Sequence, residues 1–124
     1  MAGSWNDAPG GHKSYLKTAE GHSIELLPNR VYVLGRDAQC DIKIEDPECS
    51  RRHARISISG DVRIAHVQDM GSKNGTLRNG RPVKGRAQLE SGDKIRMGNT
   101  TYEVHLGVTA ADFELDTRTR LGDF

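Results

Sequence analysis

The sequence predicts an all-β protein, a sandwich or barrel of short strands. In several short runs, apolar residues recur at every second position, and turn signals rich in Gly, Pro, Asn and Asp separate these runs. No helical periodicity of useful length occurs before residue 108. The 124 residues, 35% of them hydrophobic, are enough for one modest core and too few for two. We therefore expect one compact domain to account for most of the chain.

Seven runs alternate apolar residues with other residues and are predicted as strands, with one face toward the core. In chain order they contain Ile24 and Leu26, Val31 and Val33, Ile42 and Ile44, Ala54 to Ile58, Val62 and Ile64, Ile95 and Met97, and Tyr102 to Leu106. Turns are predicted between them, at 27–30, 46–49, 59–61, 71–75, 78–81, 91–93 and 98–99. Asn79-Gly80 suits a two-residue type I′ hairpin turn, because both central positions of that turn need a positive φ.

Composition narrows the class of protein. A formal charge of +1 with 28% charged residues lacks the large basic excess typical of nucleic-acid and membrane-surface binders. No run is long or apolar enough for a membrane span or the core of a signal peptide. Cys40 and Cys49 have no CxxC or Cys/His metal spacing. We expect a reduced, cytoplasmic protein without disulfide, metal or cofactor, and with neither nucleic-acid binding nor membrane insertion.

The chemistry suited to binding is concentrated in three predicted loops. They contain Gly35-Arg36, the SRRH sequence at 50–53 and GSKNGT at 71–76. Arg36 and Arg51 offer forked donors, and the middle loop adds a serine hydroxyl. The glycines of the last loop allow a tight turn with its amides outward. Together these groups predict a cup for a tetrahedral dianion carried on an extended peptide.

In this order and spacing, GR, SRRH and GSKNGT resemble the forkhead-associated (FHA) domain over roughly residues 22–107. The resemblance implies an FHA-type β-sandwich of about eleven strands in two sheets, whose loops at one end bind phosphothreonine peptides without catalysis. We accordingly expect an FHA domain at 15–107, preceded by a flexible leader at 1–14 and followed by a C-terminal tail at 108–124.

The resemblance also implies individual roles at the site. Arg36, Ser50, Arg51 and Lys73 would bind the phosphate, and Asn74 would hydrogen-bond the peptide main chain. Lys73 stands where many members of the family have Ser or Thr, so it either adds a cation or points to solvent.

Four further residues are expected to shape the site rather than bind: Gly35, His53, Gly75 and Thr76. In such domains His53 would fix the loop that bears Ser50. A Ser-His pair is also a hydrolase element, but Ser50 and His53 lie three apart on one short loop without a nucleophile elbow. We therefore expect no enzyme activity.

An acidic group precedes the middle loop and allows three interpretations. It does not follow a twelve-residue calcium-loop pattern, so a solvated face, or selection for a basic residue in the peptide, is favoured over a cation site. Its members are Asp41, Glu45, Asp46 and Glu48.

The sequence therefore predicts a phosphothreonine reader whose partner is a phosphothreonine-containing protein or a Ser/Thr kinase. The alternative is an adaptor of the same fold that binds an unphosphorylated protein surface. Thr109, with an acidic residue three places later, is a candidate phosphorylation site for self-association, and Thr117 and Thr119 are further candidates. Thr109 lies so close to the last predicted strand that we expect the site of its own chain to be out of reach. A second molecule would therefore have to bind it.

Overall fold

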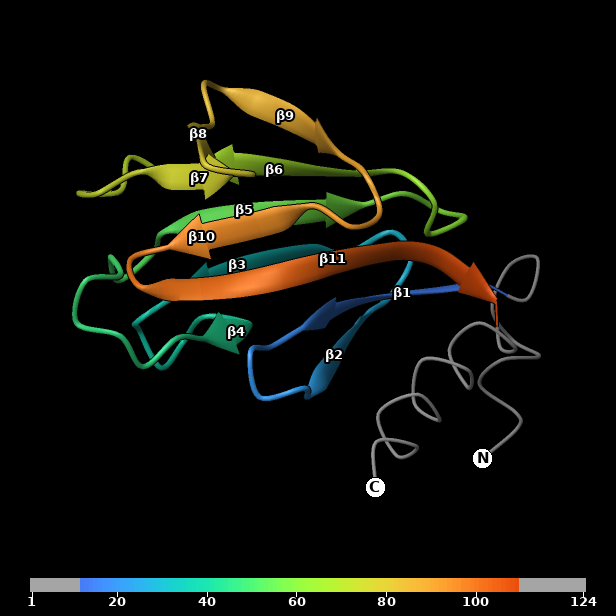
Figure 1. The fold of residues 1–124 in the computed structure, drawn as a ribbon, viewed down its shortest axis with the longest axis horizontal. Helices are drawn as coiled ribbons and strands as arrows, with labels where there is room; N and C mark the ends of the chain where they lie inside the picture. The colour runs from blue at the N-terminus through green and yellow to red at the C-terminus, as the bar shows by residue number, and fades with distance from the viewer. Residues whose placement is uncertain (1–11, 110–124) are drawn as a thin grey trace.

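The computed structural model describes residues 12–109, which form a two-layer β-sandwich of eleven strands (Figure 1). The strands are β1 His12–Lys17, β2 Ser23–Leu26, β3 Val31–Gly35, β4 Ile42–Lys43, β5 Ala54–Ile58, β6 Ala65–Asp69, β7 Thr76–Arg78, β8 Arg81–Pro82, β9 Arg86–Leu89, β10 Lys94–Met97 and β11 Thr100–Thr109. The prediction of an all-β sandwich of about eleven strands in two sheets is confirmed. No helix in this part of the chain is long and apolar enough to cross a bilayer.

The two sheets have six and five strands. The larger runs in the order β2-β1-β11-β10-β7-β8, and the smaller in the order β4-β3-β5-β6-β9. Every pairing is antiparallel except that of β3 with the two-residue β4. The connections that follow β3 and precede β5 stay within the smaller sheet, whereas the connection from β6 to β7 crosses to the larger one.

The core lies between the inner faces of the sheets, as period-two patterning requires. The burial pattern of β5 shows this directly, since Ala54, Ile56 and Ile58 are buried while Arg55 is exposed. From the other sheet, Ile95 and Val104 are completely buried. One hydrophobic cluster connects both sheets, so the loops rest on a single rigid support.

The strand predicted around Val62 and Ile64 is wrong. Val62 has a φ of 60° and lies in the turn between β5 and β6, and Ile64 is 45% exposed. Asp61 accepts a hydrogen bond from the backbone N–H of Arg63 and holds this turn, a local bond that competes with strand formation. The strand begins only at Ala65.

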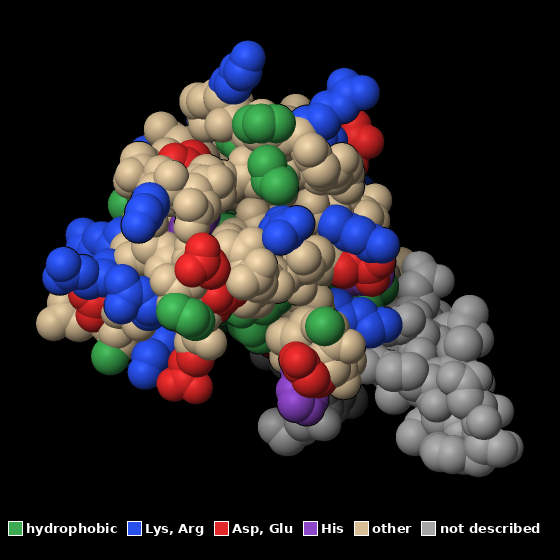
Figure 2. Space-filling view, turned by 60° about the vertical axis from the view of Figure 1, so that its left-hand side comes forward, with side chains coloured by type: hydrophobic (Ala, Val, Ile, Leu, Met, Phe, Trp, Pro, Cys, Tyr) green, Lys and Arg blue, Asp and Glu red, His purple; other side chains and the backbone are tan. Residues whose placement is uncertain are grey.

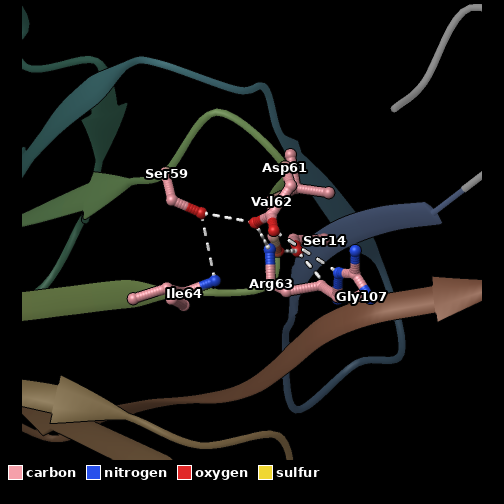
Figure 3. Close-up of polar contacts among 7 residues, drawn as sticks. All are labelled: Ser14, Ser59, Asp61, Val62, Arg63, Ile64 and Gly107. Atoms are coloured by element: carbon pink, nitrogen blue, oxygen red, sulfur yellow. Dashed lines mark hydrogen bonds and ion pairs between the residues drawn. The ribbon is translucent and has the colours of Figure 1, made fainter. Parts of the chain in front are cut away.

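This turn lies at the end of the sandwich opposite the three predicted loops (Figure 1), and Figure 3 shows how it is joined to the other sheet. The buried Ser14 hydroxyl donates to the carbonyl of Val62 and accepts a 3.0 Å bond from the N–H of Gly107. The register of β1 and β11 shifts here, between Lys13 and Tyr15. The carbonyl of Val62, a β-branched residue at a positive φ, is thus bonded to the other sheet.

The predicted Asn79-Gly80 turn is confirmed. Asn79 has a φ of 52° and Gly80 a φ of 84°, as a type I′ turn requires, and β7 and β8 pair across it. The first and last strands extend slightly beyond the predicted domain bounds of 15–107, since β1 begins at His12 and β11 continues to Thr109. The rest of the predicted leader and tail, with Thr117 and Thr119, lies outside the described residues.

Candidate functional site

The three predicted loops lie together at one end of the sandwich, on the left of Figure 1. They follow β3, precede β5 and join β6 to β7, and the tight turn between β10 and β11 lies beside them. Hydrogen bonds connect each loop to a neighbour. Segments at 35–36, 50–53 and 71–76, which are distant in the sequence, are thus brought together at one end of the molecule.

Two backbone hydrogen bonds join the loop after β3 to the loop before β5. The backbone N–H of Arg36 donates to the carbonyl of Ser50 at 3.0 Å, and that of Asp37 donates to the carbonyl of Arg51 at 3.1 Å. This approach requires glycine at position 35, because a Cβ there would lie 2.1 Å from the Arg51 carbonyl oxygen. Arg36 also donates from Nε to the Cys49 carbonyl at 3.0 Å, which fixes its guanidinium while leaving further N–H groups to donate.

His53 connects the second loop to the third and is completely buried. Its Nδ1 accepts from the backbone N–H of Ser50 at 3.0 Å, so its Nε2 carries the proton and donates to the carbonyl of Gly75 at 2.8 Å. Both ring nitrogens therefore bind backbone, and neither contacts the Ser50 hydroxyl. His53 thus joins the backbone of the loop that carries Ser50 to the backbone of the loop that carries Gly75.

The third loop is organised by Asp69. Its carboxylate accepts bonds from the backbone N–H and hydroxyl of Ser72 and from the hydroxyl of Thr76 at 2.7 Å. Burial alone would raise the pKa of Asp69, but the hydrogen bonds from Ser72 and Thr76 outweigh it and lower the pKa below its usual value. Ser72 in turn accepts from the N–H of Gly75. Thr76, predicted to be architectural, is buried and contacts Asp69.

Ser50, Lys73 and Asn74 meet where the second and third loops touch. The Ser50 hydroxyl oxygen accepts a 2.9 Å bond from the backbone N–H of Lys73, so its own proton remains able to donate to a ligand. Asn74 donates from Nδ2 to the carbonyl of Glu48 at 2.9 Å, which leaves one N–H and the carbonyl oxygen of its amide for other partners. The side chains of Lys73 and Asn74 are both exposed.

Positive charge gathers at this end of the molecule, as the Lys and Arg side chains on the left of Figure 2 show. Arg36, Arg51, Arg52 and Lys73 are all exposed. Among the described residues, none of these four forms an ion pair with a carboxylate. Cations without acidic partners around a fixed hydroxyl make an anion-binding surface.

A cavity of about 250 Å³ opens beside Asn74. Its wall combines an acidic and a basic side chain, Glu48 and Arg96, with the apolar Leu77 and the backbone of Gly98. The cavity therefore adjoins the residues of the second and third loops and of the turn between β10 and β11. Sequence reasoning missed Leu77 and Arg96, since they lie on β7 and β10 and carry no motif.

The two cysteines and the acidic group are the remaining residues that the sequence analysis considered. Cys40 and Cys49 are free thiols, and burial together with the charge of Asp46 raises the pKa of Cys49 to about 11. Within residues 12–109, no three His, Cys, Asp or Glu side chains are grouped as metal ligands.

Asp46 differs from the predicted solvated face of acidic residues, because it is only 7% exposed and accepts three hydrogen bonds.

Taken together, the β-sandwich and its cationic loop end define a binding module for anionic ligands. The chain belongs to the FHA domain family, whose model matches residues 32–98.

Three known proteins show how far the similarity extends. The oxoglutarate dehydrogenase inhibitor of Corynebacterium jeikeium is 40% identical over 73 residues, which are 59% of this chain and 49% of that protein. The crystal structure of the FHA domain of the CT664 protein from Chlamydia trachomatis matches with a TM-score of 0.71 and 30% identity, over 75% of this chain and 96% of the other. An FHA domain solved in a study of phosphothreonine-dependent FHA interactions matches with a TM-score of 0.68 and 30% identity, over 75% and 95% of the two chains. The chain thus spans about half the length of the first curated relative.

Proposed function

We propose that this chain is a non-catalytic module that binds phosphothreonine peptides of partner proteins in Ser/Thr kinase signalling. The observation that carries the proposal is the fixed Arg36 guanidinium beside a Ser50 hydroxyl that is free to donate, among cations with no acidic partner in the described residues. The FHA domain of the phosphothreonine-dependent study, at 30% identity, supports the same ligand. The free thiols favour a reducing, cytoplasmic location.

The phosphate would accept from Arg36, Ser50, Arg51 and Lys73. A phosphothreonine carries roughly −1.5 to −2 charge at neutral pH and offers three strong acceptor oxygens. Charge-assisted hydrogen bonds contribute about 1.5–3 kcal/mol each, so three or four of them contribute on the order of 5–10 kcal/mol before ordering costs. A dissociation constant in the micromolar range, roughly −8 kcal/mol, is therefore expected.

Asn74 would bind the main chain of the peptide. Its Nδ2 is already anchored by the Glu48 carbonyl, so the amide is oriented before the ligand arrives and less side-chain entropy is lost on binding. A threonine without phosphate would leave Arg36 and Arg51 without their anion, and we expect such a peptide to bind weakly or not at all.

The test is a calorimetric titration with a degenerate phosphothreonine peptide library and its unphosphorylated counterpart. Wild type should bind only the phosphorylated library, and Arg36→Ala should lower the affinity by about a hundredfold, since roughly 3 kcal/mol of charge-assisted bonding is removed. Arg30→Ala is the matched control, because Arg30 is an exposed arginine at the other end of β3. Equal binding of both libraries would support the phosphate-independent adaptor instead.

Self-association through phosphorylated Thr109 would require two molecules. Thr109 ends β11, whose first residue follows the turn beside the site, and ten residues of strand span roughly 33 Å. Thr109 therefore cannot reach the site of its own chain. Phosphorylation of Thr109 should shift a monomer to a dimer in sedimentation analysis, and Arg36→Ala should reverse the shift; a phosphorylated protein that stays monomeric would contradict this proposal.

A further inference from the structure

Asp46 lies in the first half of the second loop, between β4 and Ser50, and is not among the predicted ligand-binding residues. It is 7% exposed, although it belongs to a sequence, EDPECS, that reads as a polar turn. One carboxylate oxygen accepts a 2.9 Å bond from the backbone N–H of Glu48. The other accepts from the N–H of Asn99 at 2.7 Å and from the hydroxyl of Thr100 at 2.8 Å. The carboxylate thus joins the second loop to the turn between β10 and β11.

The turn that Asp46 holds presents two backbone carbonyls to site residues. The carbonyl of Glu48 accepts from Nδ2 of Asn74, and the carbonyl of Cys49 accepts from Nε of Arg36. The backbone N–H of Cys49 donates back to the Asp46 carbonyl at 2.9 Å. Ser50 follows directly. The orientation of three predicted ligand-binding side chains therefore depends on the 46–49 turn.

The neighbouring turn is fitted closely to this segment. Gly98 has a φ of 64°, and a Cβ on it would lie 2.9 Å from the carbonyl carbon of Glu48 and 3.0 Å from the backbone nitrogen of Cys49. Hydrogen bonds from Glu48 and Thr100 lower the pKa of Asp46 below its usual value, so the group is a carboxylate at neutral pH and can accept all three bonds.

We propose that Asp46 is a positioning residue for phosphopeptide binding, which fixes the Glu48 and Cys49 carbonyls that orient Asn74 and Arg36. The proposal rests on the function proposed above. Without the carboxylate, the N–H groups of Glu48 and Asn99 lose their acceptor, and the 46–49 turn loses its attachment to the other sheet. Arg36 and Asn74 would then sample several orientations, and the affinity for a phosphopeptide would fall although neither residue is altered.

Asp93 provides a matched control. It is also nearly buried, at 6% exposed, and its carboxylate accepts from Arg78, Asn79 and the N–H of Glu90. It precedes β10, whereas the turn bound by Asp46 follows β10, so a four-residue strand separates the two carboxylates along the sheet. Asp46→Ala and Asp93→Ala should both lower the stability of the protein, but only Asp46→Ala should change the binding site.

The experiment compares Asp46→Ala, Asp93→Ala and wild type by calorimetry with a phosphothreonine peptide, and by NMR of the Arg36 Nε–H and Asn74 side-chain amide signals. Asp46→Ala should raise the dissociation constant about tenfold or more, and Asp93→Ala should change it by less than about twofold. The two side-chain signals should shift or broaden only in Asp46→Ala. Unchanged signals and affinity in a folded Asp46→Ala protein would overturn the proposal.

A second pair of variants and a comparison without ligand keep the test decisive. If Asp46→Ala does not fold, Asp46→Asn and Thr100→Val remove fewer of the same bonds and should give smaller shifts of the same two signals. If wild type binds no phosphopeptide, the proposed function fails, while the NMR comparison without ligand still decides whether Asp46 orients Arg36 and Asn74.

Discussion

At the scale of single residues, His53 connects the second and third loops through backbone groups alone. Its two nitrogens bind the N–H of Ser50 and the carbonyl of Gly75, and its ring is completely buried. No other side chain of the same size both donates and accepts at this separation, because only imidazole has a donor and an acceptor on opposite edges of a rigid ring.

His53→Ala should lower the free energy of unfolding by about 2–4 kcal/mol, because it leaves a buried cavity and two partly buried backbone groups without partners. Urea unfolding measures this, and the exposed His22→Ala is the control. No ester hydrolysis is expected from either protein; turnover by wild type that is lost in His53→Ala would contradict a purely structural role.

Gly35 is the second residue on which the site depends. Gly35→Ala should lower the stability by about 1–3 kcal/mol, since its Cβ would overlap the Arg51 carbonyl and force the first two loops apart. Gly60→Ala is the control, because the Cβ there would meet only the end of the Asn29 side chain, at 3.3 Å. Thermal unfolding compares the two; equal melting temperatures for both variants would contradict the close approach described.

At the scale of elements, the loops and turns are held by carboxylates that accept several hydrogen bonds each. Asp69 organises the loop between β6 and β7, and Asp93 the turn before β10. Burial would raise the pKa of Asp93, but the bonds from Glu90, Asn79 and Arg78 lower it. Each turn is therefore stabilised by the ionised form of its aspartate.

This arrangement predicts a loss of stability in acid. The pKa values of Asp69 and Asp93 are lower in the folded protein than in the unfolded chain, where they are near 4. Their contribution is complete above the unfolded value and disappears as the pH falls through the folded values. Urea unfolding at pH 7, 4 and 2.5 should show the decrease, and Asp93→Asn should show a smaller one. A wild-type protein whose stability does not fall in acid would contradict the hydrogen bonding described for these two aspartates.

At the scale of the whole molecule, local charge rather than net charge decides what the surface binds. The formal charge is only +1, yet four cations at the loop end have no ion pair in the described part of the chain. Phosphopeptide affinity should therefore fall on the order of three- to tenfold between 50 and 500 mM salt, because exposed charges are screened. Arg36→Ala should have a weaker salt dependence in the same titrations. Affinity that is independent of salt would contradict a charge-based site.

The amino-acid sequence by itself determined the fold class, the Asn79-Gly80 turn and the three loop motifs. These depend on local information, since period-two alternation, turn propensity and short motifs need only neighbouring residues. The same information failed at Val62, where an alternating segment forms a turn held by Asp61 and bonded to Ser14 of the other sheet. Strands β7 to β9 were missed because they have only two to four residues, β1 because its polar residues follow no clear alternation, and β6 because only Ala65 and Val67 mark its buried face.

Only the tertiary structure decided how the site residues are oriented. The bonds from Asp46 to Asn99 and Thr100 join positions more than fifty residues apart, and those from Arg36 and Asn74 to the 48–49 carbonyls also cross between loops. The physical reason is that these acceptors are backbone carbonyls and one buried carboxylate, whose positions depend on how the two sheets pack and leave no motif in the sequence.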